Sequence, residues 1–238
     1  MSVLNIDVVG GAWITASGIG RINGGDDFSM PEGPLPVLRR DLLSSRPEER
    51  WGRLDYYSKA GLVAASLAFK DAGLEPQDVP ASTATIASTV NGSVDVDHEY
   101  FRTVVPQNGL LASPNLFAYT LPNCMLGEIS IRYGLTGPTM VISQTTPDMM
   151  NGIIGGAKLI SYGLCEGAIA GYCNTEACIN YTDTLCKPGA VFLVLQKAQE
   201  KSSLTFNGSK LKYNNRIQSG LIDFMGQLIH NRKVELQR

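Results

Sequence analysis

The residues best placed for chemistry lie where a predicted strand turns into a predicted helix, in the stretch 137–163. Residues 139–143 are β-branched and apolar, which is typical of a buried strand. Pro147 has a fixed φ and lacks an N–H, so it suits the first turn of a helix. Thr146 would then be the N-cap, and Asp148 would complement the positive end of the helix.

The predicted helix has an apolar face at helical spacing, made of Met149, Ile153, Ile154, Ala157 and Ile160. Strand, turn and helix together form an elbow. In α/β enzymes such an elbow presents a nucleophile above the helix N-terminus. The tip of this elbow carries Gln144, Thr145 and Thr146, and neither a cysteine nor a serine follows Ser143 there.

This elbow resembles the nucleophile elbow of β-ketoacyl synthases, the condensing enzymes of fatty-acid and polyketide synthesis. The family pattern reads G-P-S-x-x-V-D-T-A-C-S-S. When its first two residues are placed on Gly137 and Pro138, the family's cysteine falls on Thr146. The resemblance implies that Gln144, Thr145, Thr146 and Met149 stand at the elbow and acyl pocket, but the reactive cysteine is replaced.

Four further segments are similar to the same family. Residues 12–20 resemble its opening strand V-V-I-T-G-x-G, 59–74 its helix ending in A-L-x-D-A-G-L, 113–123 its S-P-x-x-F-x-x-x-x-x-N, and 166–172 its D-x-A-L-A-G-G. The resemblance covers about residues 12–196. It implies one half of a thiolase-fold subunit, in which the region 113–133 contributes to subunit contacts and to the acyl tunnel.

Periodicity along the chain predicts an α/β fold. Helical spacing marks 54–73 and 124–133, whereas short apolar runs mark strands at 83–89 and 190–195. Strands that alternate with helices favour a mostly parallel sheet between helices, with right-handed crossovers. We expect a thiolase-like, ketosynthase N-terminal domain over residues 1–200.

The last forty residues depart from the family pattern. Two alternating runs flank Asn207-Gly208 within 204–213, which predicts a β-hairpin. A helix capped by Asn214 or Asn215 should follow. Its predicted apolar face consists of Ile217, Leu221, Phe224, Leu228 and Ile229. We expect this segment, residues 201–238, to pack on the same domain or on a partner.

Composition excludes several functions. A net charge of −2 on 238 residues favours neither nucleic-acid nor membrane-surface binding. No apolar run reaches the roughly 18 residues of a membrane span, and the start lacks a basic n-region, so we expect a cytoplasmic protein. The five cysteines contain no C-x-x-C pair, which argues against a metal site and for small buried side chains in a reducing compartment. No cofactor is expected.

The sequence also lacks the chemistry of condensation. A condensing enzyme needs a low-pKa thiolate and two imidazoles. The family holds those imidazoles in a second half, within E-x-H-G-T-G-T and a later glycine-rich stretch, and neither motif occurs in this sequence. A threonine hydroxyl without a base is a poor nucleophile. Gln144 resembles the glutamine that replaces the cysteine in some decarboxylating or chain-length subunits, but it stands two positions early, so that role does not transfer.

Three hypotheses of function follow. The leading one is a catalytically silent subunit of chain-length-factor type, a pseudoenzyme that pairs with an active β-ketoacyl synthase elongating chains on an acyl carrier protein. The second is an enzyme of another class that uses Thr146 or a cysteine in the thiolase-like pocket. The third is a homo-oligomeric module that binds acyl chains.

The resemblance also implies a hetero- or homodimer. Ketosynthase-like subunits pair through the strand before the elbow, here 139–143, so that one sheet runs across both subunits. We therefore expect Thr139, Val141 and Ser143 at the interface, together with Phe117 and Leu126.

Overall fold

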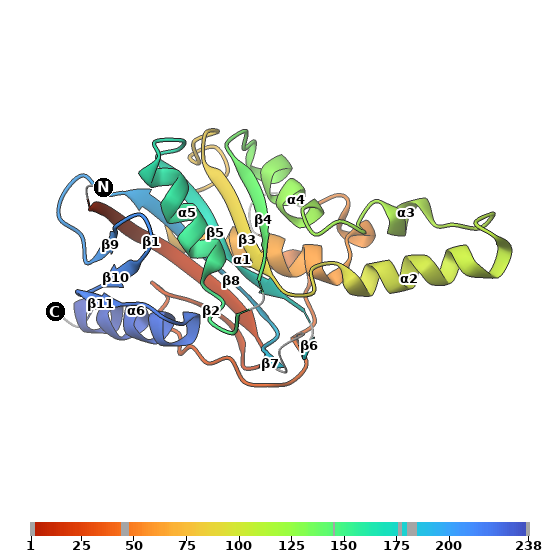
Figure 1. The fold of residues 1–238 in the computed structure, drawn as a ribbon, viewed down its shortest axis with the longest axis horizontal. Coiled ribbons are helices and arrows are strands. Elements are labelled where there is room, and N and C mark those ends of the chain that lie inside the picture. The colour runs from red at the N-terminus through yellow and green to blue at the C-terminus, as the bar shows by residue number, and fades with distance from the viewer. Residues whose placement is uncertain (1–2, 44–47, 145, 176–177, 180–184, 237–238) are drawn as a thin grey trace.

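A nine-stranded sheet forms the centre of the protein. The computed structural model describes residues 3–43, 48–144, 146–175, 178–179 and 185–236. The strand order is β11-β10-β9-β1-β8-β5-β3-β4, and β2 pairs with β1 beside this path (Figure 1).

The strands fall into two groups along the chain. The first group is β1 (Leu4–Thr15), β2 (Gly18–Arg21), β3 (Ala84–Thr89), β4 (Thr139–Ser143), β5 (Gly167–Asn174) and β8 (Gly189–Lys197). The C-terminal group is β9 (Leu204–Phe206), β10 (Leu211–Tyr213) and β11 (Arg216–Ile217). β6 (Cys178–Ile179) and β7 (Leu185–Cys186) form a separate two-stranded ribbon.

The sheet is mixed, whereas the sequence favoured a mostly parallel one. Among the described strands, β4 and β5 both run parallel to β3, and the other pairings are antiparallel. The difference arises because the described residues between β5 and β8 form the ribbon β6–β7 and no crossover helix, and β8 pairs antiparallel with β5. The apolar run 190–195 is nevertheless a strand covered on both faces, as its composition predicts.

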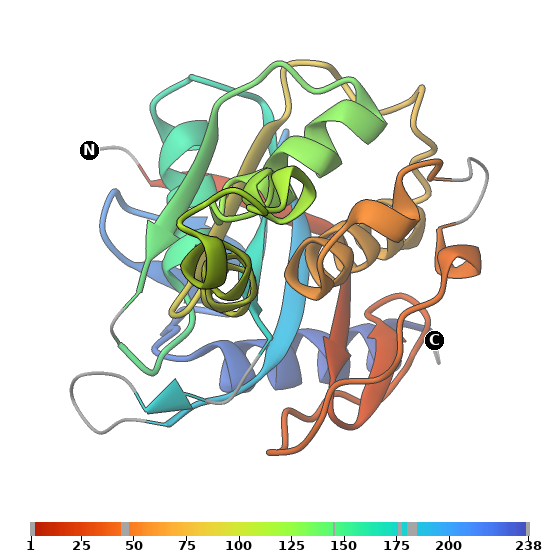
Figure 2. The same ribbon diagram turned by 90° about the vertical axis from the view of Figure 1, so that its right-hand side faces the viewer.

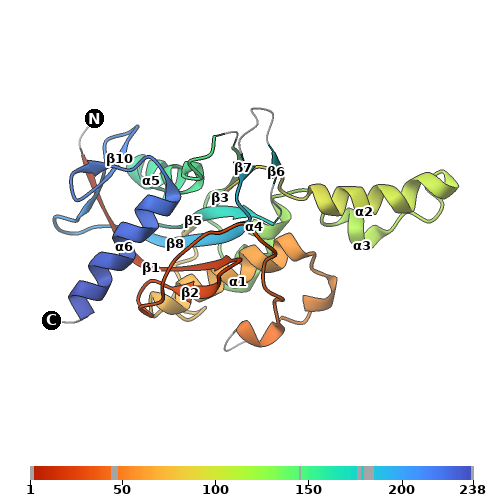
Figure 3. The same ribbon diagram turned by 90° about the horizontal axis from the view of Figure 1, so that it is seen from below.

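Helices cover the two faces of the sheet. α1 (Tyr56–Asp71) and α4 (Cys124–Tyr133) pack into one apolar cluster, and α5 (Asn151–Ser161) and α6 (Leu221–Leu236) pack into the other (Figure 2). α2 (Val94–Val104) and α3 (Pro114–Phe117) project from this body (Figures 1 and 3). Short 3-10 helices lie at Arg40–Leu42, Trp51–Arg53 and Val105–Gln107.

α1 lies within the predicted helical range 54–73, two residues inside it at each end. The Asp55 carboxylate accepts a hydrogen bond from the Ser58 N–H and caps the N-terminus. Gly73, with φ of 71°, ends the helix in a left-handed turn, and the Leu74 N–H returns to the Phe69 carbonyl at 2.9 Å.

α5 lies close against β5 because Gly152 has no side chain. A Cβ at this position would overlap the Gly171 carbonyl oxygen of β5. We expect Gly152→Ala to lower the free energy of unfolding by about 1–3 kcal/mol, through overpacking.

Urea denaturation of the variant measures this cost. Gly127→Ala is the matched control, because Gly127 is also helical, on α4, and a Cβ there would meet no other atom. That control should be neutral or slightly stabilising. Equal destabilisation by both substitutions would contradict the close approach of α5 to β5.

The C-terminal segment contains one confirmed and one wrong prediction. The hairpin around Asn207-Gly208 is present as β9 and β10. The helix, however, begins at Leu221 and is not capped by Asn214 or Asn215. Those two asparagines have φ of 49° and 64° and form a tight turn from β10 into β11. Ile217 therefore lies on β11, 53% exposed, and not on the apolar face of the helix.

α6 packs on the same sheet that the N-terminal residues form. β9 pairs with the start of β1, so the C-terminal strands extend that sheet. The apolar side chains of α6 are buried against β9, β10 and α5; they are Leu221, Phe224, Met225, Leu228 and Ile229. The Arg232 guanidinium donates to the Val8 carbonyl at 3.0 Å. No helix in the described part of the chain is both long and apolar enough to cross a membrane.

Candidate functional site: the elbow after β4 and the open strand edge

The elbow joins β4 to α5 by a longer turn than the sequence predicts. β4 ends at Ser143, as expected, but α5 begins only at Asn151, with Met150 at the N-cap. Thr146 is therefore not the N-cap, and its side chain is exposed. The helix starts late because Met149 adopts a left-handed φ of 57°, which a helix cannot contain. Thr145 lies outside the described residues.

Gln144 is the residue that organises this turn. Its side chain is 1% exposed. The Nε2 group donates to the Thr146 carbonyl at 2.8 Å and to Asp148 Oδ1 at 2.9 Å, and Oε1 accepts from the Asn151 N–H at 3.4 Å. Both the nitrogen and the oxygen of the Gln144 amide are therefore hydrogen-bonded to other residues of the turn. These bonds stabilise the conformation of the elbow.

The N-terminus of α5 is occupied by a carboxylate of the chain. Asp148 Oδ1 accepts from the Met150 N–H at 3.0 Å, and Oδ2 accepts from the Thr146 hydroxyl at 3.1 Å. A helix N-terminus favours negative charge, which in a condensing enzyme would stabilise a thiolate or an oxyanion. Here Asp148 already supplies that charge.

α6 reaches the elbow from the other side. The Leu221 N–H donates to the Asp148 carbonyl at 2.8 Å. Met149 and Met150 are buried in the same apolar cluster as Phe224 and Met225. The apolar face of α5 is consequently covered within the chain, and Met149 is 5% exposed.

Three of the five cysteines, Cys124, Cys165 and Cys173, are poor nucleophiles. Cys165 and Cys173 are buried, and burial raises the pKa of each thiol. Cys124 donates its S–H to the Ala118 carbonyl at 3.1 Å, and partial burial also raises its pKa. Thiols with raised pKa values stay protonated at neutral pH. Within the described residues, no group of three or more His, Cys, Asp or Glu side chains is arranged to hold a metal ion.

β4 presents an open edge of the sheet. It pairs with β3 on one side, and its opposite edge faces solvent. Thr139, Met140 and Ser143 are exposed, so β4 is an edge strand and not the buried strand that its composition suggests. β11, the strand at the opposite edge, spans only two residues and includes Arg216. Short, charged edges resist pairing with other chains, but β4 has neither protection.

A second exposed surface lies on the arm, which we define as residues 94–121, comprising α2 and α3. Figure 2 looks along it. Seven of its exposed side chains are large and apolar: Val94, Phe101, Val105, Leu110, Leu111, Phe117 and Leu121. The arm is internally ordered, because the Tyr100 and Phe117 rings pack at 5.4 Å and the Ser113 N–H bonds to the Thr103 hydroxyl.

Of the two interface residues predicted in this region, Phe117 is exposed and Leu126 is buried. Phe117 is 61% exposed on the arm, at the end of α3. Leu126 is fully buried in α4, in the apolar cluster shared with α1, so it offers no surface to a partner. The expectation for Leu126 is wrong because its helix turns that residue toward the core.

A mixed sheet with α1 and α4 on one face, and an elbow leading into α5 on the other, is the thiolase-like fold of ketosynthases. A model of the β-ketoacyl synthase N-terminal domain matches residues 40–193. The chain belongs to this family.

Two curated proteins with similar sequences are named as ketosynthases. The 3-oxoacyl-[acyl-carrier-protein] synthase 2 of Vibrio harveyi is 28% identical over 120 residues, and that of Vibrio cholerae is 26% identical over 120 residues. Each alignment covers 50% of this chain and 29% of the relative. The chain thus matches less than a third of each relative's length.

Solved structures agree on the fold. A chain of the ishigamide ketosynthase/chain length factor superposes with a TM-score of 0.66 and 12% identity, covering 84% of this chain and 65% of that one. A chain of the Xenorhabdus doucetiae complex of the ketosynthase ApeO with its chain length factor ApeC gives a TM-score of 0.60 and 14% identity. That match covers 97% of this chain and 92% of the other, so the two have nearly the same extent.

Proposed function

We propose that this chain is a catalytically silent, chain-length-factor-type subunit that pairs with an active β-ketoacyl synthase acting on chains carried by an acyl carrier protein. The observation that carries the proposal is the elbow. Its nucleophile position holds Thr146, and Gln144 and Asp148 engage the N-terminus of α5. A group at this position would meet a carboxylate instead of free N–H donors.

The exposed surfaces support pairing. The open edge of β4 and the apolar side chains of the arm are both costly to leave in water, because unpaired backbone groups and contiguous apolar surface favour association. A partner strand that pairs with β4 would cover the open edge of the sheet. The near-complete mutual coverage with a chain from a ketosynthase and chain-length-factor complex is consistent with this arrangement.

A second candidate function has one observation in its favour. The Thr146 hydroxyl donates to Asp148 Oδ2 at 3.1 Å, which resembles a nucleophile beside a base. The same carboxylate accepts a hydrogen bond from the Met150 N–H and thereby holds the start of α5, and no imidazole of the described residues lies in the Thr146–Asp148 contact to relay a proton. This arrangement therefore favours a structural role for Thr146.

Thr146→Cys tests both candidates. We expect the purified variant to show no condensation of malonyl-acyl carrier protein and no acylated cysteine by intact-protein mass spectrometry. The reason is that the added thiol would face Asp148, which opposes the thiolate by like charge. Thr146→Ser serves as the control. Acyl loading or condensation by the single variant in isolation would refute the silent-subunit proposal.

A further inference from the structure

Glu128 places a buried carboxylate at the base of the arm. It is 6% exposed and lies on α4, on the buried face that also carries Met125 and Ile129. A charge taken out of water is costly unless it is paired, and a buried ion pair is often no more stable than an apolar replacement of similar volume. Stability alone therefore does not explain a glutamate at this position.

The two oxygens of Glu128 bind two different segments of the chain. Oε1 accepts a hydrogen bond from the Tyr119 hydroxyl at 3.0 Å, and Oε2 accepts from the Arg50 guanidinium at 2.7 Å. Tyr119 belongs to the arm, just after α3, whereas Arg50 belongs to the loop before α1. Burial and the neighbouring Glu128 carboxylate raise the pKa of Tyr119 to about 12, so its hydroxyl keeps the donated proton at neutral pH.

Other contacts at the base of the arm are less directional or weaker. Val96 packs into the apolar cluster of α1 and α4, and apolar contacts have no preferred direction. The Ser93 hydroxyl donates to the Thr120 carbonyl at 2.6 Å, which ties the two ends of the arm to each other. The Cys124 thiol, bonded to the arm at Ala118, is a weak donor. The bond from the Tyr119 hydroxyl is charge-assisted and therefore stronger.

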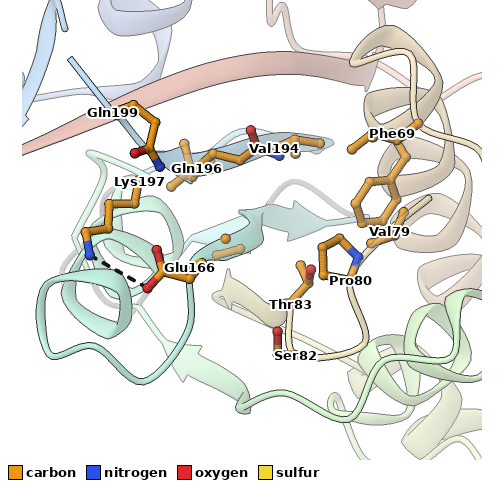
Figure 4. Close-up of a pocket in the computed structure, with 14 residues that line it drawn as sticks. Phe69, Val79, Pro80, Ser82, Thr83, Glu166, Val194, Gln196, Lys197 and Gln199 are labelled. Carbon is orange, nitrogen blue, oxygen red and sulfur yellow. Dashed lines mark ion pairs between the residues drawn. The ribbon is translucent and has the colours of Figure 1, made fainter. Parts of the chain in front are cut away.

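Another ion pair provides a comparison within the same protein. Lys197 Nζ and Glu166 Oε1 lie 3.7 Å apart in an open cleft at the other end of the sheet, and both residues are exposed (Figure 4). Exposed pairs of this kind contribute little to stability. The contact between Arg50 and Glu128 differs because its carboxylate is buried and also accepts a hydrogen bond from the arm.

We propose that Glu128 is a positioning residue, which acts through Tyr119 to fix the direction in which the arm presents its apolar side chains to the ketosynthase. Arg50 balances the charge of the carboxylate. An arm that is already held in its binding orientation loses less conformational freedom on association, so the complex is tighter. This inference rests on the proposed pairing with a ketosynthase.

NMR relaxation of the backbone amides in the isolated chain tests the positioning without a partner. In the parent chain we expect α2 to have order parameters of about 0.85, like the rigid body. Tyr119→Phe removes only the hydroxyl, and Glu128→Leu removes its acceptor. Both should lower the order parameters of the arm toward the value of about 0.6 that marks flexible backbone, and leave those of the sheet unchanged.

Two further variants separate positioning from a general loss of structure. Glu128→Gln keeps an oxygen that can accept from Tyr119, and Arg50 retains Glu48, with Nε and Oε1 3.6 Å apart. This conservative variant should therefore retain an ordered arm. Glu166→Gln weakens the exposed ion pair of Figure 4 and is the matched control, which should behave as the parent does.

Affinity for the ketosynthase is the second measurement. Tyr119→Phe and Glu128→Leu should each weaken binding by about tenfold, whereas Glu128→Gln should change it by less than about threefold. Urea denaturation confirms that each variant is folded under the conditions of the assay.

Three results would overturn the inference. They are an arm that stays ordered in both Tyr119→Phe and Glu128→Leu, a loss of order that is equal in the arm and in the sheet, and undiminished affinity in a variant whose arm has become flexible. If the parent binds no ketosynthase but the order parameters change as expected, the proposed function fails and the positioning of the arm by Glu128 stands.

Discussion

Val141→Asp is expected to separate this chain from the ketosynthase that we propose as its partner. Val141 lies in the middle of β4, which ends the sheet. The hydrogen bonds that the flanking residues make to β3, from the Thr85 N–H to the Pro138 carbonyl and from the Gln144 N–H to the Thr89 carbonyl, imply that the Val141 backbone faces outward. A buried, unpaired carboxylate at such an interface costs several kcal/mol, so affinity should fall by about a hundredfold or more.

Co-purification with a tagged ketosynthase, quantified by light scattering, measures this loss. Val141 also packs against the core on its own side of the sheet, so Val141→Asp lowers stability as well. Ser143→Lys places a charge on the same edge without disturbing the core, because Ser143 is exposed in the free chain. Its effect on binding can therefore be separated from a loss of stability. Val141→Thr keeps size and β-branching and should retain the complex. Undiminished binding by both charged variants would exclude β4 as the contact.

Phe224→Ala is expected to have the largest effect on folding. Phe224 is fully buried, and its ring packs edge-on against Tyr213 with centroids 5.9 Å apart. Removing a buried phenylalanine leaves a cavity and costs about 3–5 kcal/mol. The same change would uncover the elbow, because Phe224 shares an apolar cluster with Met149 and Met150.

Urea denaturation followed by far-UV circular dichroism gives this free energy. Phe101→Ala is the matched control, since Phe101 is 64% exposed on the arm. Its substitution should change stability by no more than about 0.5 kcal/mol. Similar losses from both substitutions would mean that α6 does not pack on the sheet as described.

Local signals in the sequence predicted most of the elements. The helical spacing of 54–73, the β-branched run of β4 and the Asn-Gly turn between β9 and β10 all act within a few residues. Their physical causes are local, so they can be recognised without tertiary information. The boundaries of α4 and β4 agree with the sequence to the residue.

The predicted starts of α5 and α6 were wrong because their residues suit more than one local conformation, and tertiary contacts select among these conformations. Asn214 and Asn215 suit both a helix cap and a left-handed turn, and the pairing of β10 with β11 selects the turn. Pro147 suits the first turn of a helix, but the left-handed Met149 delays α5 to Asn151. The hydrophobic periodicity of the sequence predicts neither the turn at Asn214 and Asn215 nor the late start of α5.

The candidate site was only partly predictable. The family pattern locates the elbow and the missing cysteine, because both are sequence properties. The network in which Gln144 binds Asp148 and the N-terminus of α5 depends on how the turn folds. Likewise, periodicity cannot distinguish an interior strand from an edge strand, so the exposure of β4 required the strand order.

The most direct measurement of the central claim is a condensation assay on the chain alone and on its complex with an active ketosynthase of the same organism. Malonyl-acyl carrier protein is the substrate, and mass spectrometry follows the products and any acylated residue. We predict no acylation and no product with the chain alone, and elongated chains with the complex. Acylation of the isolated chain, or a stable monomer that binds no ketosynthase at micromolar concentration, would contradict its role as a silent partner subunit.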